Sequence, residues 1–292
     1  MTEELGSPIT LPGEEITMID TVDSAAWLDK VRAQRPLVHN ITNLVVTNIA
    51  ANALLAIGAS PVMAYARQEV GDMARIAASL ALNMGTLDEA VVEAMWIAGR
   101  AADEAGVPVV FDPVGVGATP YRNQVAEAIL RDMKLAVLRG NAGEISVLLG
   151  AGGAVKGVDS AGAGSGLTQA MQRHARASGR VVIATGAIDY VADGERLWAL
   201  KNGHPLLAAI TGSGCMATAI LGAFVGAAGR HASAATYAQA CVAALTCYNV
   251  AGEIAAGQAH GPGTFQAALF DALYHLDGPA VNARARIDRL EG

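Results

Sequence analysis

The chain has 292 residues, of which 52% are hydrophobic and only 4% aromatic, and its formal net charge is −7. This length allows one large α/β domain, and the small aliphatic residues with 33 glycines favour helices packed closely on a parallel sheet over an aromatic-rich β-sandwich. The negative charge argues against a nucleic-acid partner.

In chain order, the hydrophobic spacing predicts helices that alternate with short strands. Helices are expected over 22–35, 43–57, 87–104, 121–131, 142–149 and 167–178. Strands are expected over 60–64, 80–84, 107–111, 135–138 and 181–184, followed by a hairpin that pairs 190–191 with 197–200. Residues 150–166 are glycine-rich and irregular, and long helices run from Cys215 onward. The alternation predicts an α/β fold of one domain with a central, mostly parallel sheet flanked by helices.

Three stretches, 36–66, 205–229 and 231–252, carry no charged residue and are each long enough to span a bilayer. Their amide and small hydroxyl side chains suit hydrocarbon poorly, and no cationic cluster flanks them. We therefore expect them to be buried within the protein or an oligomer, with no membrane partner. Residues 1–20 lack the apolar core of a signal peptide and are expected to be a loose leader before a domain over 21–292.

Cysteine usage points to a reducing compartment. Cys215, Cys241 and Cys247 form neither a disulfide framework nor a metal-binding spacing. Cys241 and Cys247 are expected to be buried free thiols. We therefore predict a cytoplasmic protein.

The segment ITGSGC at 210–215 leads into a charge-free run of helix-forming residues. Its glycines allow a tight turn, and the first turn of a helix adds unpaired N–H groups that bind anions. Cys215 would stand at this helix start, where a thiol is expected to ionise more easily than in bulk apolar surroundings. The segment therefore predicts an anion hole beside a reactive thiol, or else a glycine-containing loop that enters a buried helix.

The same glycines offer a second interpretation. Gly212, Gly214 and Ala217 fit a dinucleotide-binding fingerprint, and residues 205–210 could form the strand that it needs. No acidic residue follows before Glu253, so the ribose partner is missing and a nicotinamide-dependent oxidoreductase is a weak alternative. The Walker A pattern is also missing.

Ligands bind beyond the carboxyl ends of parallel strands, so the polar residues that follow the predicted strands are the candidates. An aspartate there suits a metal ion or a phosphate-bound water, or it serves as a helix-cap or turn residue. An Asn and a Glu three positions apart form either a capping box or a hydrated Mg²⁺ site. Together these groups and the anion hole fit phosphoryl transfer. The candidates are Asn83, Asp112, Asn141 with Glu144, and Thr185.

A resemblance to the ribokinase-like kinases of vitamin and sugar metabolism is carried by ITGSGC at 210–215, RGNAGE at 139–144 and DPVGVG at 112–117. Within that group, the chain is similar to the hydroxyethylthiazole kinase family at HNITN (39–43), ANALLAIGASPVMA (51–64), KGVDS (156–160), TGAIDY (185–190) and GPGTF (261–265). These segments occur in order and cover most of the chain.

The resemblance implies a ribokinase-like fold and transfer of the ATP γ-phosphate to the hydroxyl of 4-methyl-5-(2-hydroxyethyl)thiazole, with Mg²⁺, in thiamine biosynthesis or salvage. It implies that Met63, Gly212 and Asn43 bind the thiazole. It further implies ATP binding by Arg122, Thr185 and Asn141, Mg²⁺ binding by Glu144 and Asp112, and catalysis by Cys215, at the position where other ribokinase-like enzymes carry an aspartate base. The family is trimeric, so a homotrimer with sites between subunits is expected.

One departure from the family is Ala187, where members often carry a glutamate, and this leaves open how the nucleotide is held there. A sister kinase acting on hydroxymethylpyrimidine or pyridoxal is the nearest alternative function, which the 39–64 region disfavours. A non-catalytic small-molecule-binding module is a further alternative.

Overall fold

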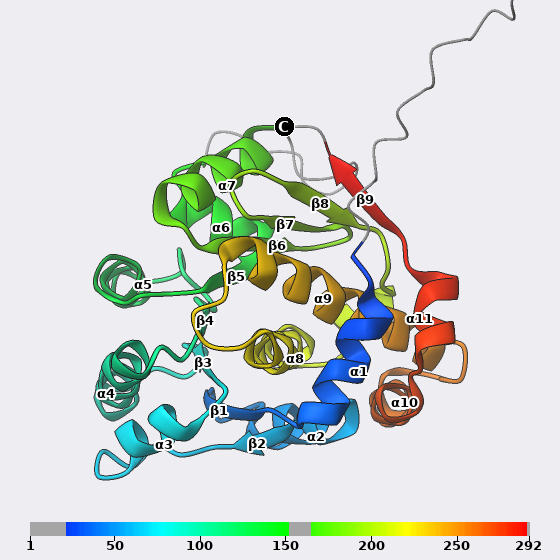
Figure 1. The fold of residues 1–292 in the computed structure, drawn as a ribbon, viewed down its shortest axis with the longest axis horizontal. Coiled ribbons are helices and arrows are strands. Elements are labelled where there is room, and N and C mark those ends of the chain that lie inside the picture. The colour runs from blue at the N-terminus through cyan, green and yellow to red at the C-terminus, as the bar shows by residue number, and fades with distance from the viewer. Residues whose placement is uncertain (1–21, 152–164, 291–292) are drawn as a thin grey trace, which may run out of the picture.

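The computed structural model describes residues 22–151 and 165–290, whose centre is a nine-stranded sheet in the order β2-β1-β3-β4-β5-β6-β7-β8-β9 (Figure 1). The pairings from β2 to β6 are parallel, and those from β6 to β9 are antiparallel. The strands are β1 (Leu37–Ile41), β2 (Ser60–Val62), β3 (Ser79–Asn83), β4 (Val109–Asp112), β5 (Val137–Asn141), β6 (Val181–Thr185), β7 (Asp189–Ala192), β8 (Leu197–Leu200) and β9 (Ile287–Leu290).

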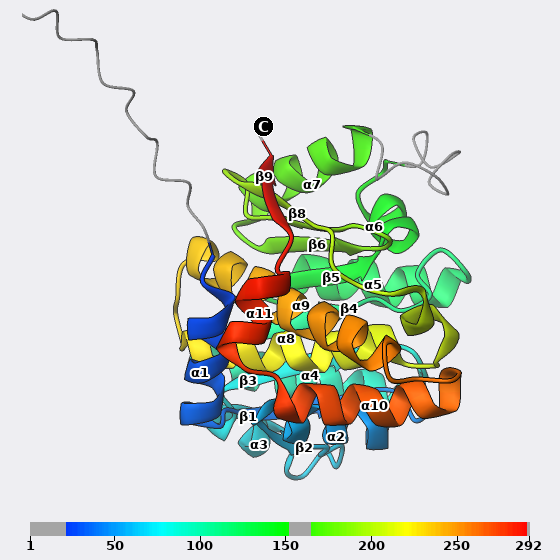
Figure 2. The same cartoon turned by 90° about the vertical axis from the view of Figure 1, so that its right-hand side faces the viewer.

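Helices cover both faces of the sheet, as Figures 1 and 2 show. One face carries α3 (Val70–Ile76), α4 (Glu89–Ala105), α5 (Pro120–Asp132), α6 (Ala142–Leu148) and α7 (Ser165–Ser178). The other carries α1 (Ser24–Gln34), α2 (Thr47–Ile57), α8 (Ser213–Ala228), α9 (Ala234–Ala256), α10 (Pro262–His275) and α11 (Gly278–Arg284). Each layer has its own hydrophobic core. The predicted architecture, a mostly parallel sheet flanked by helices in one domain, is confirmed.

The alternation of side chains along the central strands supplies both cores. In β3, Leu80 and Leu82 face the α3–α7 layer, whereas Ala81 faces the α8–α9 layer, and all three are buried. The register sets Asn83 beside Asp112 and Asn141 beside Thr185. Polar residues at the carboxyl ends of neighbouring strands are thereby brought level with one another.

Helix α8 lies unusually close to the sheet. A Cβ added at Gly222 would stand 2.8 Å from Cγ1 of Val38, and one at Gly226 would stand 3.1 Å from Cβ of Ala78. The Ser79 hydroxyl also donates a 2.6 Å hydrogen bond to the carbonyl of Gly222. Glycine therefore fixes the height at which α8, and the loop that precedes it, stand above the strands.

Several elements differ from the sequence-based expectation. Strand β1, helix α3 and strand β9 were not predicted, and the helix expected from residue 43 begins at Thr47. The strand that the dinucleotide-binding alternative needs at 205–210 is not formed, because Pro205–Ala209 is a 3₁₀ helix. The expected leader over 1–20 and the KGVDS motif lie outside the described residues.

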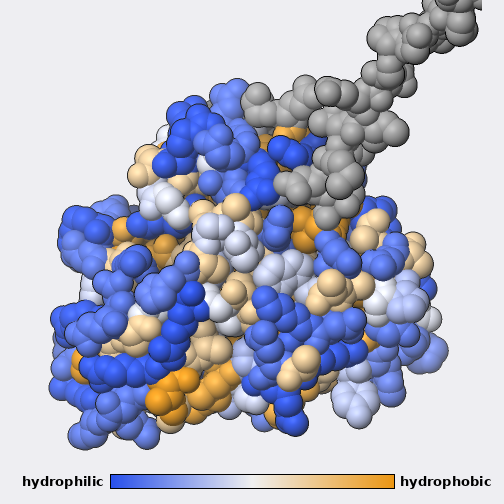
Figure 3. All heavy atoms as spheres, in the orientation of Figure 1, coloured by the Kyte–Doolittle hydropathy of each residue, from blue (hydrophilic) through white to orange (hydrophobic). Residues whose placement is uncertain are grey.

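Two predictions about surfaces and thiols can be checked directly. Within residues 22–151 and 165–290, no helix is long and apolar enough to cross a membrane. The face in Figure 3 is largely hydrophilic, with hydrophobic residues in small separate patches. Cys241 and Cys247 are fully buried free thiols, as predicted.

Candidate active site

The loop before α8 turns at a glycine and leaves the start of the helix without a side-chain cap. Gly212 is the N-cap of α8 at φ 81°, a left-handed conformation that favours glycine, and no side chain caps the helix. A Cβ at Gly212 would stand 2.4 Å from Cγ1 of Val46 and 2.7 Å from Cδ1 of Ile49. The loop therefore packs tightly on α2 while the first N–H groups of α8 keep their capacity to bind an anion.

A cavity of about 440 Å³ opens beside this helix start, at the carboxyl ends of β5 and β6. Its lining combines strand-end polar groups with small residues of α8 and the inner face of α9. The lining residues are Arg139, Asn141, Thr185, Gly186, Asp189, Leu207, Ala208, Ser213, Gly214, Ala217, Leu245, Tyr248 and Asn249. Of the predicted site residues, Thr185 and Asn141 line this cavity, and Gly212 and Cys215 lie next to it in sequence.

Arg139 is the main cation of the cavity, and sequence reasoning missed it. One guanidinium nitrogen donates to Oγ1 of Thr185 at 2.7 Å, and another donates to Oδ2 of Asp112 at 3.3 Å. A Cβ at Gly214 would stand 3.0 Å from this guanidinium, so Arg139 lies against the first turn of α8. Its place in the RGNAGE motif, directly after the predicted strand over 135–138, was the available signal.

Arg122, which the resemblance pointed to for ATP, is held elsewhere. Its guanidinium donates to the carbonyls of Met84, Val114 and Gly85 at 2.6, 2.7 and 2.8 Å. These bonds tie together the loops that follow β3 and β4. In this structure Arg122 therefore has a structural role.

Cys215 is partly exposed, and its sulfur lies between two asparagine side chains. Nδ2 of Asn83 donates to Sγ at 3.2 Å and Nδ2 of Asn43 at 3.4 Å. Burial raises the pKa of the Cys215 thiol, and the charge of Asp112 raises it further, whereas the two amides and Arg139 lower it. The thiol is therefore less acidic than a free cysteine, because desolvation is the largest influence on its pKa.

Asp112 is fully buried at the end of β4. Its Oδ2 accepts from Asn83 at 2.8 Å, from Thr218 at 2.7 Å and from Arg139 at 3.3 Å. Burial raises the pKa of this carboxyl against the opposing charge of Arg139. The helix-cap alternative is wrong, because Thr119 caps α5. Oδ1 is buried and has no hydrogen-bond partner among the described residues, so it retains the capacity to bind a ligand.

Asn141 and Glu144 form the predicted capping box at the start of α6. Oε2 of Glu144 accepts from the backbone N–H of Asn141 at 2.8 Å, and Oε1 accepts from the N–H of Gly115 at 2.8 Å. Glu144 therefore also holds the loop after β4. Among the described residues, no three His, Cys, Asp or Glu side chains cluster in a way that could hold a metal ion. A cation here would depend on phosphate oxygens and water as further ligands.

The residues expected to bind the thiazole lie at two places. Asn43 is buried, and besides its bond to Cys215 it donates to Oδ1 of Asn83 at 2.8 Å. Met63 follows β2 and is half-buried against the α8–α9 core. Between them in sequence, Leu44 and Leu55 are 77% and 54% exposed, which leaves an apolar surface on this part of the chain.

Three of the lining residues hold the walls of the cavity in place. Asp189 is buried, which raises the pKa of its carboxyl, and it accepts from the N–H of Gly186 at 2.9 Å and from Nδ2 of Asn249 at 2.8 Å. The hydroxyl of Tyr248 donates to the carbonyl of Ser213 at 2.9 Å. These bonds join the turn after β6 and the start of α8 to the same helix, α9.

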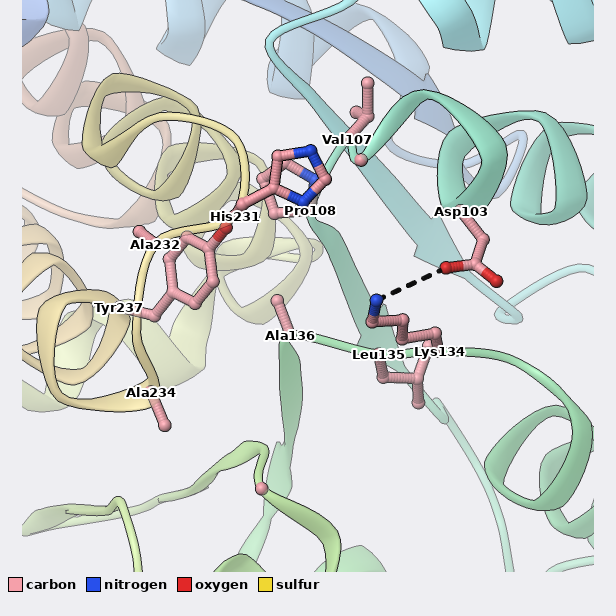
Figure 4. A pocket seen from close by; sticks show the side chains of 12 residues that line it. Asp103, Val107, Pro108, Lys134, Leu135, Ala136, His231, Ala232, Ala234 and Tyr237 are labelled. Atoms are coloured by element: carbon pink, nitrogen blue, oxygen red, sulfur yellow. Dashed lines mark ion pairs between the residues drawn. The ribbon is translucent and has the colours of Figure 1, made fainter.

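A second cavity, of about 290 Å³, lies at the opposite edge, where the amino ends of β4, β5 and β6 approach the start of α9 (Figure 4). At its rim the ammonium of Lys134 lies 3.6 Å from Oδ1 of Asp103. The hydroxyl of Tyr237 donates to the carbonyl of Gly229 at 3.0 Å. These polar groups pair within the protein, and no predicted site residue lines this cavity.

The sheet order and the two helical layers define a ribokinase-like fold. A ribokinase-like superfamily protein from Enterococcus faecalis shares the fold, with a TM-score of 0.59 and 12% identity over 86% of this chain and 95% of its own. The sequence profile of the hydroxyethylthiazole kinase family matches residues 28–278. The chain therefore belongs to the hydroxyethylthiazole kinase family.

Individual relatives agree with this assignment. The hydroxyethylthiazole kinase of Moorella thermoacetica is 55% identical over 263 residues, which cover 90% of this chain and 96% of that one. The solved structure of the hydroxyethylthiazole kinase protein from Pyrococcus horikoshii has a TM-score of 0.82 and 42% identity, covering 92% of this chain and 99% of its own. The protein is thus an enzyme of the kinase class.

Proposed function

We propose that this protein transfers the γ-phosphoryl group of ATP to the hydroxyl of 4-methyl-5-(2-hydroxyethyl)thiazole, in thiamine biosynthesis or salvage. The observation that carries the proposal is the cavity in which Arg139 and Thr185 face the first turn of α8, in a chain of the hydroxyethylthiazole kinase family. Cation, hydroxyl and helix N–H groups converge there, and phosphoryl transfer depends mainly on such positioned donors. The proposed use of ATP and the free thiols of Cys215, Cys241 and Cys247 support a location in the cytoplasm.

The phosphate groups are assigned to Arg139, Thr185 and the N–H groups of residues 213–215, with Asn141 at the cavity wall. Arg139 takes the contact that the resemblance placed at Arg122, because Arg122 already donates to three carbonyls. A planar guanidinium suits the oxygens of a phosphate and neutralises the charge of the transferred group.

Mg²⁺ is assigned to Asp112, with Glu144 nearby. Oδ1 of Asp112 is buried and has no hydrogen-bond partner among the described residues, and one or two carboxylates with phosphates and water satisfy this ion. When bound, Mg²⁺ neutralises charge on the phosphate oxygens. The chain itself holds the carboxylate in place through Asn83, Thr218 and Arg139.

The thiazole alcohol is assigned to the region of Met63, Asn43 and Gly212, with its hydroxyl toward Cys215. A thioether packs adaptably against an aromatic ring, which suits Met63. The exposed apolar residues Leu44, Val45 and Leu55 support a homotrimer in which a neighbouring subunit completes this pocket.

A coupled ADP-release assay tests the function, with the thiazole alcohol, hydroxymethylpyrimidine and pyridoxal offered separately. Turnover with the thiazole alcohol and little with the other two is expected. Preference for either of the others would identify a sister kinase, and ligand binding without ADP release would identify a non-catalytic module. A nicotinamide enzyme is disfavoured, because Pro205–Ala209 is not a strand.

The assignment of the phosphates to Arg139 is tested by Arg139→Lys with Arg122→Lys as the matched control. Lysine cannot reproduce the forked geometry, so Arg139→Lys should raise KM for ATP by about tenfold or more. Arg122→Lys should lower the melting temperature and leave KM for ATP within about threefold, since it removes only carbonyl contacts. A raised KM for ATP in Arg122→Lys, with an unchanged KM in Arg139→Lys, would assign the ATP contact to Arg122.

A further inference from the structure

The side chain of Asn83 makes four hydrogen bonds, which connect it to Asp112, Cys215, Asn43 and Gly85. Asn83 ends β3 and is 2% exposed. Its amide nitrogen donates to Oδ2 of Asp112 at 2.8 Å and to Sγ of Cys215 at 3.2 Å. Its carbonyl oxygen accepts from Nδ2 of Asn43 at 2.8 Å and from the N–H of Gly85 at 3.0 Å. An asparagine side chain offers two donors and two acceptor positions, so all four are filled.

Backbone N–H groups fix the orientation of both amides at the sulfur. The N–H of Gly85 requires oxygen on one side of the Asn83 amide, and the N–H of Val45 requires oxygen on one side of the Asn43 amide. A flip of either amide would set two donors against each other. Both side chains therefore present N–H groups, and not oxygen, to the sulfur of Cys215.

We infer that Asn83, assisted by Asn43, is a positioning residue that holds the Cys215 sulfur as a double hydrogen-bond acceptor and directs its remaining side toward the substrate hydroxyl. Two N–H donors occupy two directions around Sγ, so the S–H bond or a third lone pair takes the direction that is left. Cys215 is a partly exposed residue, and we assign the ligand to this remaining direction. This inference rests on the proposed function for the identity of that ligand.

The protonation state of the sulfur decides whether its open side donates or accepts a hydrogen bond. A neutral thiol donates to the substrate oxygen, whereas a thiolate accepts the substrate proton. In the second case, the hydroxyl oxygen bonds to the γ-phosphorus, the bond from that phosphorus to the departing ADP oxygen breaks, and the proton moves to sulfur. The amide donors favour this acceptor state, because they bond more strongly to a charged sulfur.

The surrounding charges act on the same sulfur from several elements. Asp112 on β4 opposes ionisation of the thiol, and Arg139 on β5 favours it. Tyr248 on α9 lies nearby and is buried, which raises the pKa of its phenol, so it stays neutral. Asn83 is thus the residue that bonds directly to both the carboxylate of Asp112 and the sulfur.

The first test measures alkylation of Cys215 by iodoacetamide against pH, site by site by mass spectrometry, without ATP or Mg²⁺. Asn83→Ala should move the midpoint of the profile upward by about one pH unit, since a donor to the thiolate is lost. Asn202→Ala is the matched control, because Asn202 is also a buried hydrogen-bonded asparagine but bonds to Glu253 and to the backbone near Arg286. Buried Cys241 and Cys247 report unfolding in every sample.

The second test is a double-mutant cycle on kcat. Asn83→Ala should lower kcat by about tenfold or more in the wild-type background and by less than about threefold in a Cys215→Ala background, with KM for the alcohol nearly unchanged. Equal losses in both backgrounds would show that Asn83 acts through Asp112 and overturn the inference. An unshifted alkylation profile in Asn83→Ala would also overturn it. A shifted profile in a protein that does not phosphorylate the alcohol would refute the proposed function alone.

Discussion

Cys215 illustrates how little a single residue's position in the sequence says about its acidity. A cysteine at a helix start normally gains from the partial positive charge of the first turn, an effect of about 0.3–1 kcal/mol. Here burial is the largest influence on the pKa of the thiol, and it acts in the opposite direction. Asn83 and Asn43 reduce the cost of a charged sulfur. They come from distant parts of the chain.

The first prediction concerns Cys215 itself. Cys215→Ala should lower kcat by about 10- to 100-fold without abolishing it, because positioning and charge neutralisation supply most of the catalysis. Cys215→Asp should equal or exceed the alanine variant, since a carboxylate accepts a proton more readily. Initial rates in the ADP-release assay measure both. A phosphorylated Cys215 trapped in a quenched wild-type reaction would contradict this role.

Glu144 provides a second prediction, because its two oxygens already hold two backbone N–H groups. Glu144→Gln turns one acceptor into a donor, which should cost about 1–2 kcal/mol in the free energy of unfolding. If Glu144 also helps to hold Mg²⁺, activity should fall as well and recover partly when Mg²⁺ is raised. Urea unfolding and Mg²⁺ titrations of the rate separate these effects.

Asp88→Ala is the control for that experiment, since Asp88 caps α4 through a 2.8 Å bond to the N–H of Val91 and has no place in the site. It should lower stability by about 1 kcal/mol and leave the Mg²⁺ dependence unchanged. A Glu144→Gln enzyme with wild-type kinetics at limiting Mg²⁺ would confine Glu144 to its capping role.

At the scale of elements, the sequence predicted the fold best where hydrophobic runs were continuous. The strands β3, β4 and β6 and the hairpin of β7 with β8 were recognised in this way. Strand β1 was missed because its interior residues His39 and Asn40 are polar, although both are buried. Strand β9 pairs antiparallel with β8 from the far end of the chain, so nothing local indicates its partner.

The site residues that follow recognisable hydrophobic strands could be predicted, and those brought in from distant segments could not. Residues that directly follow strands, such as Asp112 and Thr185, were found because parallel strands bring their carboxyl ends together. Arg139 was overlooked, because its place at the cavity depends on the position of β5 between β4 and β6, which the local sequence does not indicate. Asp189 and Tyr248 line the same cavity although they come from distant segments, β7 and α9.

A third prediction belongs to the loop before α8. Gly212→Ala meets two obstacles, a positive φ that costs about 1–2 kcal/mol and a Cβ that would overlap Val46. Gly179→Ala is the matched control, because Gly179 has φ +70° with nothing within 4 Å of an added Cβ. Both should lose stability in urea unfolding, Gly212→Ala more so.

Activity separates the two variants further. Gly212→Ala should reduce kcat/KM strongly, because displacement of the loop moves the N–H groups of α8, whereas Gly179→Ala should keep wild-type kinetics. Equal stability and equal activity for the two variants would show that the loop before α8 accommodates a Cβ at residue 212 and is not tightly positioned.

For the whole molecule, we predict an oligomer in which Met63 of one subunit completes the site beside Cys215 of another. A stretch without charge over 36–66, with Leu44 and Val45 77% and 65% exposed, indicates a surface that a neighbouring subunit covers. The test mixes Met63→Lys and Cys215→Ala proteins in equal amounts, after dissociation and reassociation. Shared sites should restore about one quarter of wild-type activity, since each site draws its two residues from different chains at random.

As a control, each variant is dissociated and reassociated alone. Its residual rate is subtracted from the rate of the mixture. Recovery near zero in oligomers shown by mass to be mixed would place Met63 in the site of its own subunit. A fully active monomer in sedimentation experiments would refute the shared site altogether.

The glycines that bring α8 down onto the sheet also restrict how this enzyme can change. A side chain at Gly222 would push α8 away from Val38 and displace the anion-binding turn with it. Substitution of Gly222 is therefore not tolerated during evolution. The loops after β1, β2 and β6 contain no glycine whose added Cβ would overlap the sheet. New substrate preferences should therefore arise by mutation of these loops, while the buried run of α8 accepts few changes in any selection that demands phosphoryl transfer.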